Sequence, residues 1–584
     1  MRTAMMAALV GAAFAALAGR AAAQADVPSK VPLVFNRYHT ADELDRAMRD
    51  LAAAYPEIAS LRRVGSSVGG RDMLVLVISA TKTGPDTEKP AMWIDGGIHA
   101  NEVQAAEVVL YTAWYLTKMY GVNPTLTSMI DERAFYLCAM VNPDARVAWF
   151  ETPATPHNFR ANLRPVDDDR DGLFDEDGPD DLDGDGAITT MWKKDPHGRW
   201  IRDKDDPRIF RRVAPDKAGE WTMLGEEGID NDGDGRINED GPGGDDMNRN
   251  FPGGWLPNYV QWGAGPYPLS APETRAVADF IEARPNIAAA QAYHNTGGMI
   301  LRGPGAEFRS SMYPAQDARV YEELAKTGEQ LLPYYRSLVI WKDLYTVHGG
   351  FVNWTAESLG IFSFTNELWT VEKYFQRAPS SPNEEQQWLW RDRMLFGQAF
   401  SEYKPFNHPT HGEVLIGGPN QWSSRSTPTF MLEEECHRNF AFTVYHADQM
   451  PRVAFDAVEA AAMGGGLWEV TVTLRNDRLI PTRSEHARRN RIGANDVLWC
   501  EPEGRGRVVT SGRLSSRSDR RFDEVLNEPG RVQLDGGVPG RGVVHHRFIV
   551  EGERGTRVNL SFTSQKSRDA SIHVVLGEAA GAAK

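Results

Sequence analysis

Short apolar runs that end in polar residues organise the first two thirds of the chain. One run covers residues 91–98, closes with glycines and is followed by His99 and, three residues later, by Glu102. Apolar side chains then recur at helical spacing from Val103 to Lys118. The pattern predicts a buried strand over 91–98 and a helix with Glu102 in its first turn.

Two further apolar runs also end in residues with reactive side chains. Residues 286–293 precede His294, and residues 360–366 precede Glu367. Both runs are short enough to be buried strands. Ligand sites in open α/β sheets lie beyond the carboxyl ends of strands, so both histidines are expected at such a site.

The remaining pattern predicts further helices and a separate region of strands. Helices are expected over residues 40–55, 381–403 and 429–449, with a turn-rich connection over 408–419. After three glycines at 464–466 the pattern changes to the alternation typical of strands, over residues 468–474, 542–550, 557–562 and 570–576. An α/β region followed by a small antiparallel β-sandwich is therefore expected.

His99, Glu102 and His294 are candidate metal ligands. Imidazole nitrogens and carboxylate oxygens both bind zinc, and a catalytic zinc takes three protein ligands and keeps one position open for water. The H-x-x-E spacing alone is weak evidence, and a single histidine after a strand is more often a hydrogen-bonded structural residue. The matching positions of the two histidines favour a shared site.

Taken in order, the motifs resemble those of the zinc carboxypeptidases of the funnelin type, peptidase family M14. They comprise Gly65–Asp72, the pair His99 and Glu102, Asn142–Asp144, Phe159–Arg164, Asp246–Phe251, His294, Tyr345 and Glu367. The resemblance extends from about Tyr38 to Phe406, and the interval from Tyr345 to Glu367 equals the family's own. It implies an α/β fold with a mixed, mostly parallel sheet flanked by helices and with zinc at the strand ends.

The resemblance also implies how the reaction is catalysed. The implied ligands of Zn²⁺ are His99, Glu102 and His294. The metal polarises the scissile carbonyl and lowers the pKa of its bound water, and Glu367 is the general base. Arg160 stabilises the oxyanion of the tetrahedral intermediate, although Arg164 or a residue of the following insertion could supply that cation instead.

Other matched residues are implied to bind or orient the substrate. Asn248 and Arg249 hold the terminal carboxylate of the substrate, which a guanidinium can bind through both oxygens. Tyr345 closes over the bound substrate. Asp246 orients a zinc histidine, expected to be His99. Val352 occupies a position that helps set the preferred C-terminal side chain. An apolar residue there argues against a basic-residue pocket, although the insertion could override this.

The negative charge of the chain is concentrated in two windows. The formal net charge is −16, while residues 167–185 hold eleven acids and one base and residues 226–246 hold nine acids and one base. The remainder of the chain therefore carries about +2. Such local acidity excludes nucleic acid as the default partner.

Both windows contain the motif D-x-D-x-D-G, and a third, shorter copy follows the first. Aspartates in this pattern resemble the start of EF-hand-type calcium loops, although the glutamate of position twelve is missing. The candidate Ca²⁺ ligands are Asp167, Asp169, Asp171, Asp175, Asp181, Asp183, Asp185, Asp230, Asp232 and Asp234. The alternative is a solvated acidic loop without metal. Trp192, Trp200 and Trp221, between the motifs, indicate that the insertion is folded.

The N-terminus and the cysteines bear on location. A basic start, an alanine-rich apolar stretch and an A-x-A ending predict a secretory signal peptide, so an exported (periplasmic or extracellular) protein without a membrane span is expected. Cys138 is expected as a buried thiol, and Cys436 and Cys500 could pair. The expected parts are a signal peptide (1–25), a catalytic domain (34–450) with an insertion at about 165–245, and a β-sandwich domain (451–584).

The leading expectation is hydrolysis of the C-terminal peptide bond of peptides or proteins with a free C-terminus. A peptidoglycan-peptide hydrolase of the same fold is one alternative, because cell-wall peptides also offer a terminal carboxylate. A non-catalytic, calcium-dependent binding protein that uses the insertion and the sandwich is the other.

Overall fold

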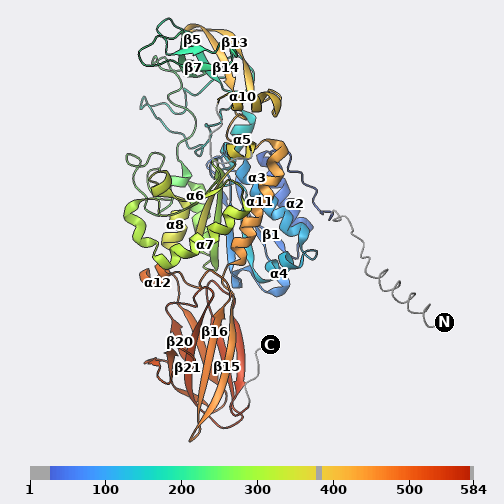
Figure 1. Cartoon of the computed structure of the whole chain (residues 1–584), viewed down its shortest axis with the longest axis vertical. Coiled ribbons are helices and arrows are strands. Elements are labelled where there is room, and N and C mark those ends of the chain that lie inside the picture. The colour runs from blue at the N-terminus through green and yellow to red at the C-terminus, as the bar shows by residue number, and fades with distance from the viewer. Residues whose placement is uncertain (1–26, 376–383, 579–584) are drawn as a thin grey trace, which may run out of the picture.

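The computed structural model describes residues 27–375 and 384–578. The expected signal peptide lies outside these residues. A central α/β region carries a small sheet at one end of the long axis and a β-sandwich at the other (Figure 1). Within the described residues, no helix combines the length and apolarity needed to cross a membrane.

An eight-stranded sheet forms the centre of the molecule, in the order β1-β2-β4-β3-β9-β12-β10-β11. Its strands are β1 (Ala59–Ser66), β2 (Asp72–Ile78), β3 (Ala91–Asp95), β4 (Ala134–Cys138), β9 (Ile287–Asn295), β10 (Met299–Arg302), β11 (Arg336–Val339) and β12 (Phe362–Leu368). The four inner strands β4, β3, β9 and β12 are parallel, whereas β1, β2 and β10 pair antiparallel with their inner neighbours. The predicted mixed, mostly parallel sheet is confirmed.

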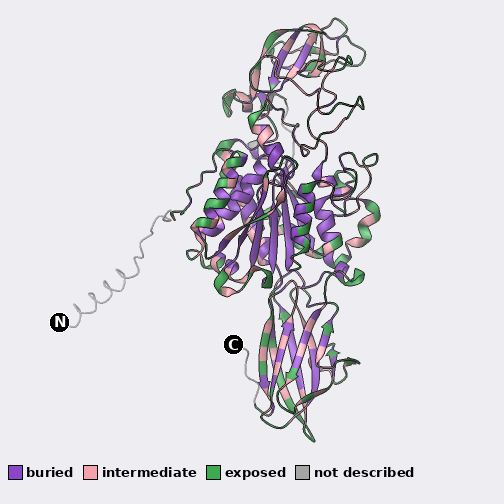
Figure 2. Ribbon diagram, turned by 180° about the vertical axis from the view of Figure 1, so that it is seen from behind, coloured by how far each residue is buried: buried purple, intermediate pink, exposed green. Residues whose placement is uncertain are grey.

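Helices cover both faces of this sheet, and its inner strands β3, β4, β9 and β12 are buried between them (Figure 2). One core contains residues of α2 (Ala41–Ala54), α3 (Gln104–Met119), α4 (Pro124–Glu132), α5 (Pro143–Glu151), α7 (Ala315–Leu331) and α11 (Thr429–Asp448). The other contains residues of α6 (Pro272–Glu282) and α8 (Phe351–Leu359). The helices predicted over 40–55 and 429–449 are thus confirmed as α2 and α11. Shorter helical segments are η1 (Thr81–Thr83), η2 (Asp86–Glu88), η3 (Met247–Arg249), η4 (Glu307–Met312), the π-helical η5 (Ile340–Leu344), α9 (Val371–Phe375), α10 (Glu384–Arg393) and α12 (Glu485–Asn490).

The insertion forms a second sheet together with a distant hairpin. The antiparallel order is β13-β14-β5-β8-β6-β7. Its strands are β5 (Thr190–Lys194), β6 (Trp200–Arg202), β7 (Phe210–Arg212), β8 (Trp221–Glu226), β13 (Phe400–His408) and β14 (Gly412–Pro419). Trp192 stacks on Phe210 with ring centroids 3.8 Å apart, and Phe210 also contacts Trp221. The insertion is therefore folded, as its tryptophans indicated.

The predictions of a helix to residue 403 and of a turn-rich connection over 408–419 are wrong. The helix ends at Arg393, and both later segments are strands of one hairpin. Aromatic side chains at 400, 403 and 406 fit helical spacing, so the local pattern does not exclude a helix there. Pairing of β14 with β5 overrides that local pattern, and Tyr403 packs edge-on against Phe210 of the insertion.

Two antiparallel sheets form the C-terminal sandwich around a common core, as predicted. The five-stranded sheet contains β15 (Val453–Gly464), β16 (Leu467–Asn476), β21 (Gly542–Glu551), β18 (Arg507–Leu514) and β19 (Asp523–Glu524). The four-stranded sheet contains β20 (Arg531–Leu534), β17 (Asp496–Pro502), β22 (Arg557–Thr563) and β23 (Ala570–Val575). Cys138, Cys436 and Cys500 are all buried and free, so the possible pairing of Cys436 with Cys500 is not formed.

Candidate active site

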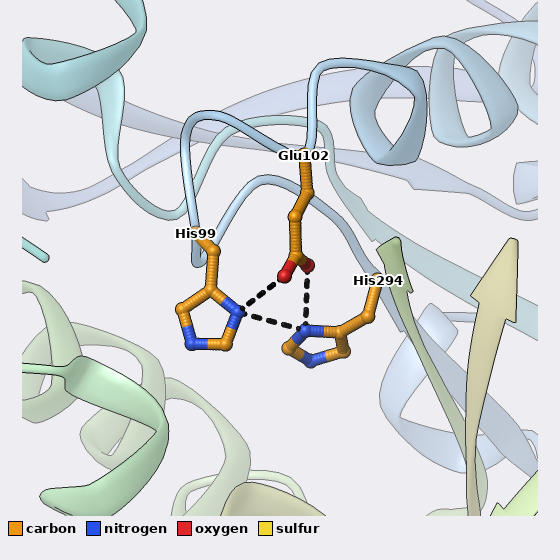
Figure 3. A group of neighbouring side chains, drawn as sticks. All are labelled: His99, Glu102 and His294. Carbon is orange, nitrogen blue, oxygen red and sulfur yellow. Dashed lines mark hydrogen bonds and ion pairs between the residues drawn. The ribbon is translucent and has the colours of Figure 1, made fainter. Parts of the chain in front are cut away.

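Two histidines and a glutamate converge at the carboxyl ends of the inner strands (Figure 3). His99 lies in the turn after β3, and His294 lies within β9. Nδ1 of His99 is 3.0 Å from Oε1 of Glu102 and 3.0 Å from Nδ1 of His294, which is 2.9 Å from Oε2 of Glu102. All three residues are buried. Parallel pairing of β3 with β9 brings the two histidines to the same edge of the sheet.

The position of Glu102 differs slightly from the prediction. The helix α3 begins at Gln104, so Glu102 lies in the preceding turn and not in the first helical turn. Its carboxylate accepts a hydrogen bond from the backbone N–H of Asn295 at 3.0 Å and one from Arg160 at 3.0 Å. These contacts aim both oxygens toward the histidines.

The donor set fits a zinc ion. Two imidazole nitrogens and two carboxylate oxygens face one point, and the far nitrogen of each ring already has a neighbour. Nε2 of His99 is 3.0 Å from Oδ1 of Asp246, and Nε2 of His294 is 3.3 Å from Nδ2 of Asn248. A histidine whose outer nitrogen donates to a carboxylate presents its other nitrogen as a metal ligand. Asp246 thus contacts His99, as the resemblance implied.

Glu367 lies beside the three ligands on β12. The register of β12 with β9 pairs Glu367 with His294. Burial, together with the nearby charge of Glu102, raises the pKa of Glu367 to about 7. Its carboxylate has no hydrogen-bond partner among the described residues. It is therefore available to a molecule in the adjoining cavity.

A cavity of about 500 Å³ opens at this point, and the predicted substrate-binding residues line it. Arg249 and Asn248 come from η3, where Oδ1 of Asn248 accepts a hydrogen bond from the backbone N–H of Phe351 at 2.9 Å. Tyr345, 58% exposed, follows η5 at the cavity wall. Val352 is buried in α8 and presents an apolar surface to the same space. The structure brings all of these residues together.

Arg160 and Arg164 occupy different environments. Arg160 lines the cavity and is 3.2 Å from Oδ2 of Asp246 as well as bonded to Glu102. Arg164 instead binds both oxygens of Asp245 at 2.9 Å. Of the two candidate cations, only Arg160 faces the cavity among the described residues.

A third arginine of the cavity wall, Arg425, was not predicted from the sequence. Its guanidinium donates to the backbone carbonyl of Asn295 at 2.7 Å and lies 3.4 Å from Oε1 of Glu102. Arg425 lies in the connection between β14 and α11. No spacing relates it to the zinc ligands, so only its place in the fold reveals it.

The acidic motifs do not contribute to this cavity. Within the described parts of the chain, the residues that line it include none from 167–185 or 226–240. The acids of the cavity wall are Glu102, Asp246 and Glu367. Six of the candidate calcium ligands form carboxylate clusters elsewhere in the insertion: Asp167, Asp169, Asp171, Asp230, Asp232 and Asp234.

Comparison with known proteins agrees with this geometry. Residues 44–178 and 187–390 match the family described as Zinc carboxypeptidase, and residues 452–575 match a domain of unknown function (DUF8731). Mouse carboxypeptidase A2 is 24% identical over 374 residues, covering 61% of this chain and 69% of the relative. Mouse carboxypeptidase A1 is 25% identical over 362 residues, covering 60% and 68%.

Among solved structures, carboxypeptidase A from Helicoverpa armigera matches with a TM-score of 0.44 and 18% identity, covering 73% of this chain and 77% of that one. The family match covers more than half of the 584 residues, is interrupted only at residues 179–186 within the acidic insertion, and includes all three candidate zinc ligands. The chain belongs to the zinc carboxypeptidase family, M14.

Proposed function

We propose that this protein is a zinc carboxypeptidase that removes the C-terminal residue from peptides with a free terminal carboxylate. The observation that carries the proposal is the convergence of His99, Glu102 and His294 beside the unpartnered carboxylate of Glu367. A metal-binding protein without activity would have no need of an unpartnered carboxylate that faces the cavity beside the metal ligands.

The residues around the metal have different roles in hydrolysis. When bound by His99, Glu102 and His294, zinc supplies a Lewis acid for the scissile carbonyl and promotes deprotonation of water. The carboxylate of Glu367 takes a proton from the attacking water and delivers it to the nitrogen of the leaving amine. Arg160 offers a fixed guanidinium to the oxygen that becomes negatively charged.

The substrate is oriented by its terminal carboxylate. The guanidinium of Arg249, buried at the cavity wall, can bind both carboxylate oxygens, and Asn248 lies beside it. The exposed phenol of Tyr345 can move over the bound substrate and donate a further hydrogen bond. These contacts select a free C-terminus and place the last peptide bond near Glu367.

Apolar C-terminal side chains fit this cavity best. Val352, Leu301 and Ile340 line it, whereas the acids of its wall belong to the metal site. A lysine or arginine side chain would lose its hydration there without meeting a carboxylate in compensation. We therefore propose that residues such as leucine or phenylalanine are released faster than basic ones. We also propose that the protein is exported, on the basis of its first 25 residues alone.

A peptide panel assayed with and without zinc tests this function. The panel contains blocked dipeptides ending in phenylalanine, leucine, lysine or arginine, the same peptides as C-terminal amides, and muropeptides. We expect zinc-dependent release of the apolar residues and no cleavage of the amides. Efficient release from muropeptides alone would replace the proposal with a peptidoglycan-peptide hydrolase, and no release from any substrate by the zinc-loaded protein would refute it.

A further inference from the structure

The two longer acidic motifs face each other across a short bridge. Loop A (residues 167–177) and loop B (residues 230–240) each begin with D-x-D-x-D-G. The backbones meet where Asp177 pairs antiparallel with Asp240, whose N–H donates to the carbonyl of Asp177 at 3.1 Å. The eleventh residue of each loop therefore lies at the centre of the pair.

Carboxylates of one loop complete clusters in the other. Asp240 of loop B gathers with Asp167 and Asp169 of loop A. The reverse cluster joins Asp177 of loop A to Asp230 and Asp232 of loop B. In each cluster, oxygens from three carboxylates lie within 4.8 Å of one another. Each cluster therefore combines the first and third residues of one loop with the eleventh residue of the other loop.

Several carboxylate oxygens of loops A and B are buried without a hydrogen-bond partner. Asp177 and Asp240 are 0% exposed, yet Oδ2 of each has no hydrogen-bond partner. Both carboxylate oxygens of Glu176 and of Glu239, the tenth residue of each loop, are likewise buried and unpartnered. A buried ionised carboxylate oxygen without a hydrogen bond is strongly unfavourable, and a bound cation would compensate these oxygens.

The negative charge of the two loops far exceeds the positive charge of their own residues. Loops A and B together contain twelve acids and two arginines, Arg170 and Arg236. Like charges this close repel each other strongly where water is scarce.

The third acidic motif (residues 181–186) provides a contrast. Asp183 forms an ion pair of 3.1 Å with Lys404 of β13. No buried carboxylate oxygen of this motif lacks a partner in the described part of the chain. Among the three acidic motifs, buried carboxylate oxygens without a partner therefore occur in loops A and B, as far as the structure describes them.

We propose that loops A and B together bind at least two Ca²⁺ ions, one in each crossed cluster. All the ligand atoms are oxygens, as hard cations require, and no histidine or cysteine takes part. Calcium accepts six to eight oxygens in flexible geometry and tolerates bidentate carboxylates, whereas Mg²⁺ demands a near-ideal octahedron and retains water. Such dense carboxylates therefore favour calcium.

Bound calcium would act as a structural crosslink between the two strands of chain that join the insertion to the catalytic region. Loop A begins three residues after Arg164, and loop B ends five residues before Asp245, which Arg164 binds. Asn162 and Asp245 also exchange backbone and side-chain hydrogen bonds at this junction. The proposed crosslink thus lies close to the junction between the insertion and the catalytic region, where Asp245 precedes Asp246 of the zinc site.

Calorimetric titration of the full-length, zinc-loaded protein, freed of calcium with a chelator and resupplied with zinc, tests this proposal. We expect at least two Ca²⁺ per chain with dissociation constants of about a millimolar or lower, and a rise in Tm on adding calcium. Equal concentrations of Mg²⁺ should raise Tm less. Replacing both Asp177 and Asp240 with asparagine should weaken calcium binding at least about tenfold and abolish most of the rise in Tm.

Asp205→Asn is the matched control, because it removes one exposed acid of the same insertion outside both loops. It should leave calcium affinity and the calcium-induced rise in Tm unchanged. The titration of the unmodified protein decides the question even if the double variant does not fold. Absence of both binding heat and a shift in Tm at about 10 mM calcium would overturn the proposal, as would equal stabilisation by magnesium.

Discussion

Replacing Glu367 with glutamine should separate proton transfer from metal binding. The two side chains have similar shapes, but the amide cannot accept the proton of the attacking water. Glu367 has no hydrogen-bond partner among the described residues, so the change breaks no contact of the fold. His99, Glu102 and His294 keep their mutual contacts. We therefore expect zinc content and Tm close to those of the unmodified protein.

The size of the effect follows from the position of the carboxylate. Glu367 lines the cavity next to His294 on the paired strand, so its carboxylate can reach a water molecule at the metal. Loss of a positioned general base slows a reaction by about 10² to 10⁴-fold. This corresponds to about 2.7 to 5.4 kcal/mol in activation free energy, at about 1.36 kcal/mol for each tenfold change. Because Arg249 is untouched, most of the loss should appear in kcat and little in KM.

The assay combines turnover of a blocked dipeptide ending in phenylalanine with the zinc content of each purified variant. Glu102→Gln serves as the comparison, because it removes a ligand and should lose zinc and activity together. The reasoning about Glu367 would be refuted by near-normal turnover of Glu367→Gln. It would equally be refuted if this variant lost its zinc as Glu102→Gln does.

Three further predictions concern specificity, metal affinity and stability. Val352→Asp places a carboxylate in the apolar wall of the cavity. It should raise the ratio of kcat/KM for lysine-ending peptides to kcat/KM for phenylalanine-ending peptides by at least about tenfold, and an unchanged ratio would assign specificity to other residues. Asp246→Asn should weaken zinc binding or activity about 10 to 100-fold, because it loosens the contact with Nε2 of His99. Zinc affinity is measured by competition with a chelating dye, and wild-type zinc affinity and activity would contradict this role. His446 is buried without hydrogen bonds, and burial lowers its pKa to about 3. Below pH 6.5 the unfolded chain therefore takes up a proton that the folded chain does not, and stability falls as the pH falls. Denaturant unfolding at pH 7 and pH 5 should show that His446→Phe loses about 2 kcal/mol less than the parent over this interval, and an identical loss in both would contradict the prediction.

Arg425 and the hairpin of β13 and β14 show where sequence reasoning was insufficient. Arg425 enters the cavity because the chain returns to it between β14 and α11, more than fifty residues after Glu367. The hairpin forms because β5, about two hundred residues earlier, offers an edge to pair with. Local periodicity predicts neither the position of Arg425 nor the hairpin, since both depend on contacts between distant segments.

The sequence by itself determined the elements that hold the zinc site. Three apolar runs that end in His99, His294 and Glu367 specify strands, and parallel pairing carries their ends to one edge of the sheet. The acidic motifs could also be identified from the sequence, because alternating aspartates before a glycine form a local pattern. Only the tertiary structure decided that loop A faces loop B and that Oδ2 of Asp177 and Oδ2 of Asp240 are buried without a hydrogen-bond partner. The reason is physical: periodicity and turn chemistry act between neighbours in the chain, whereas burial and charge balance depend on which distant segments the fold brings into contact.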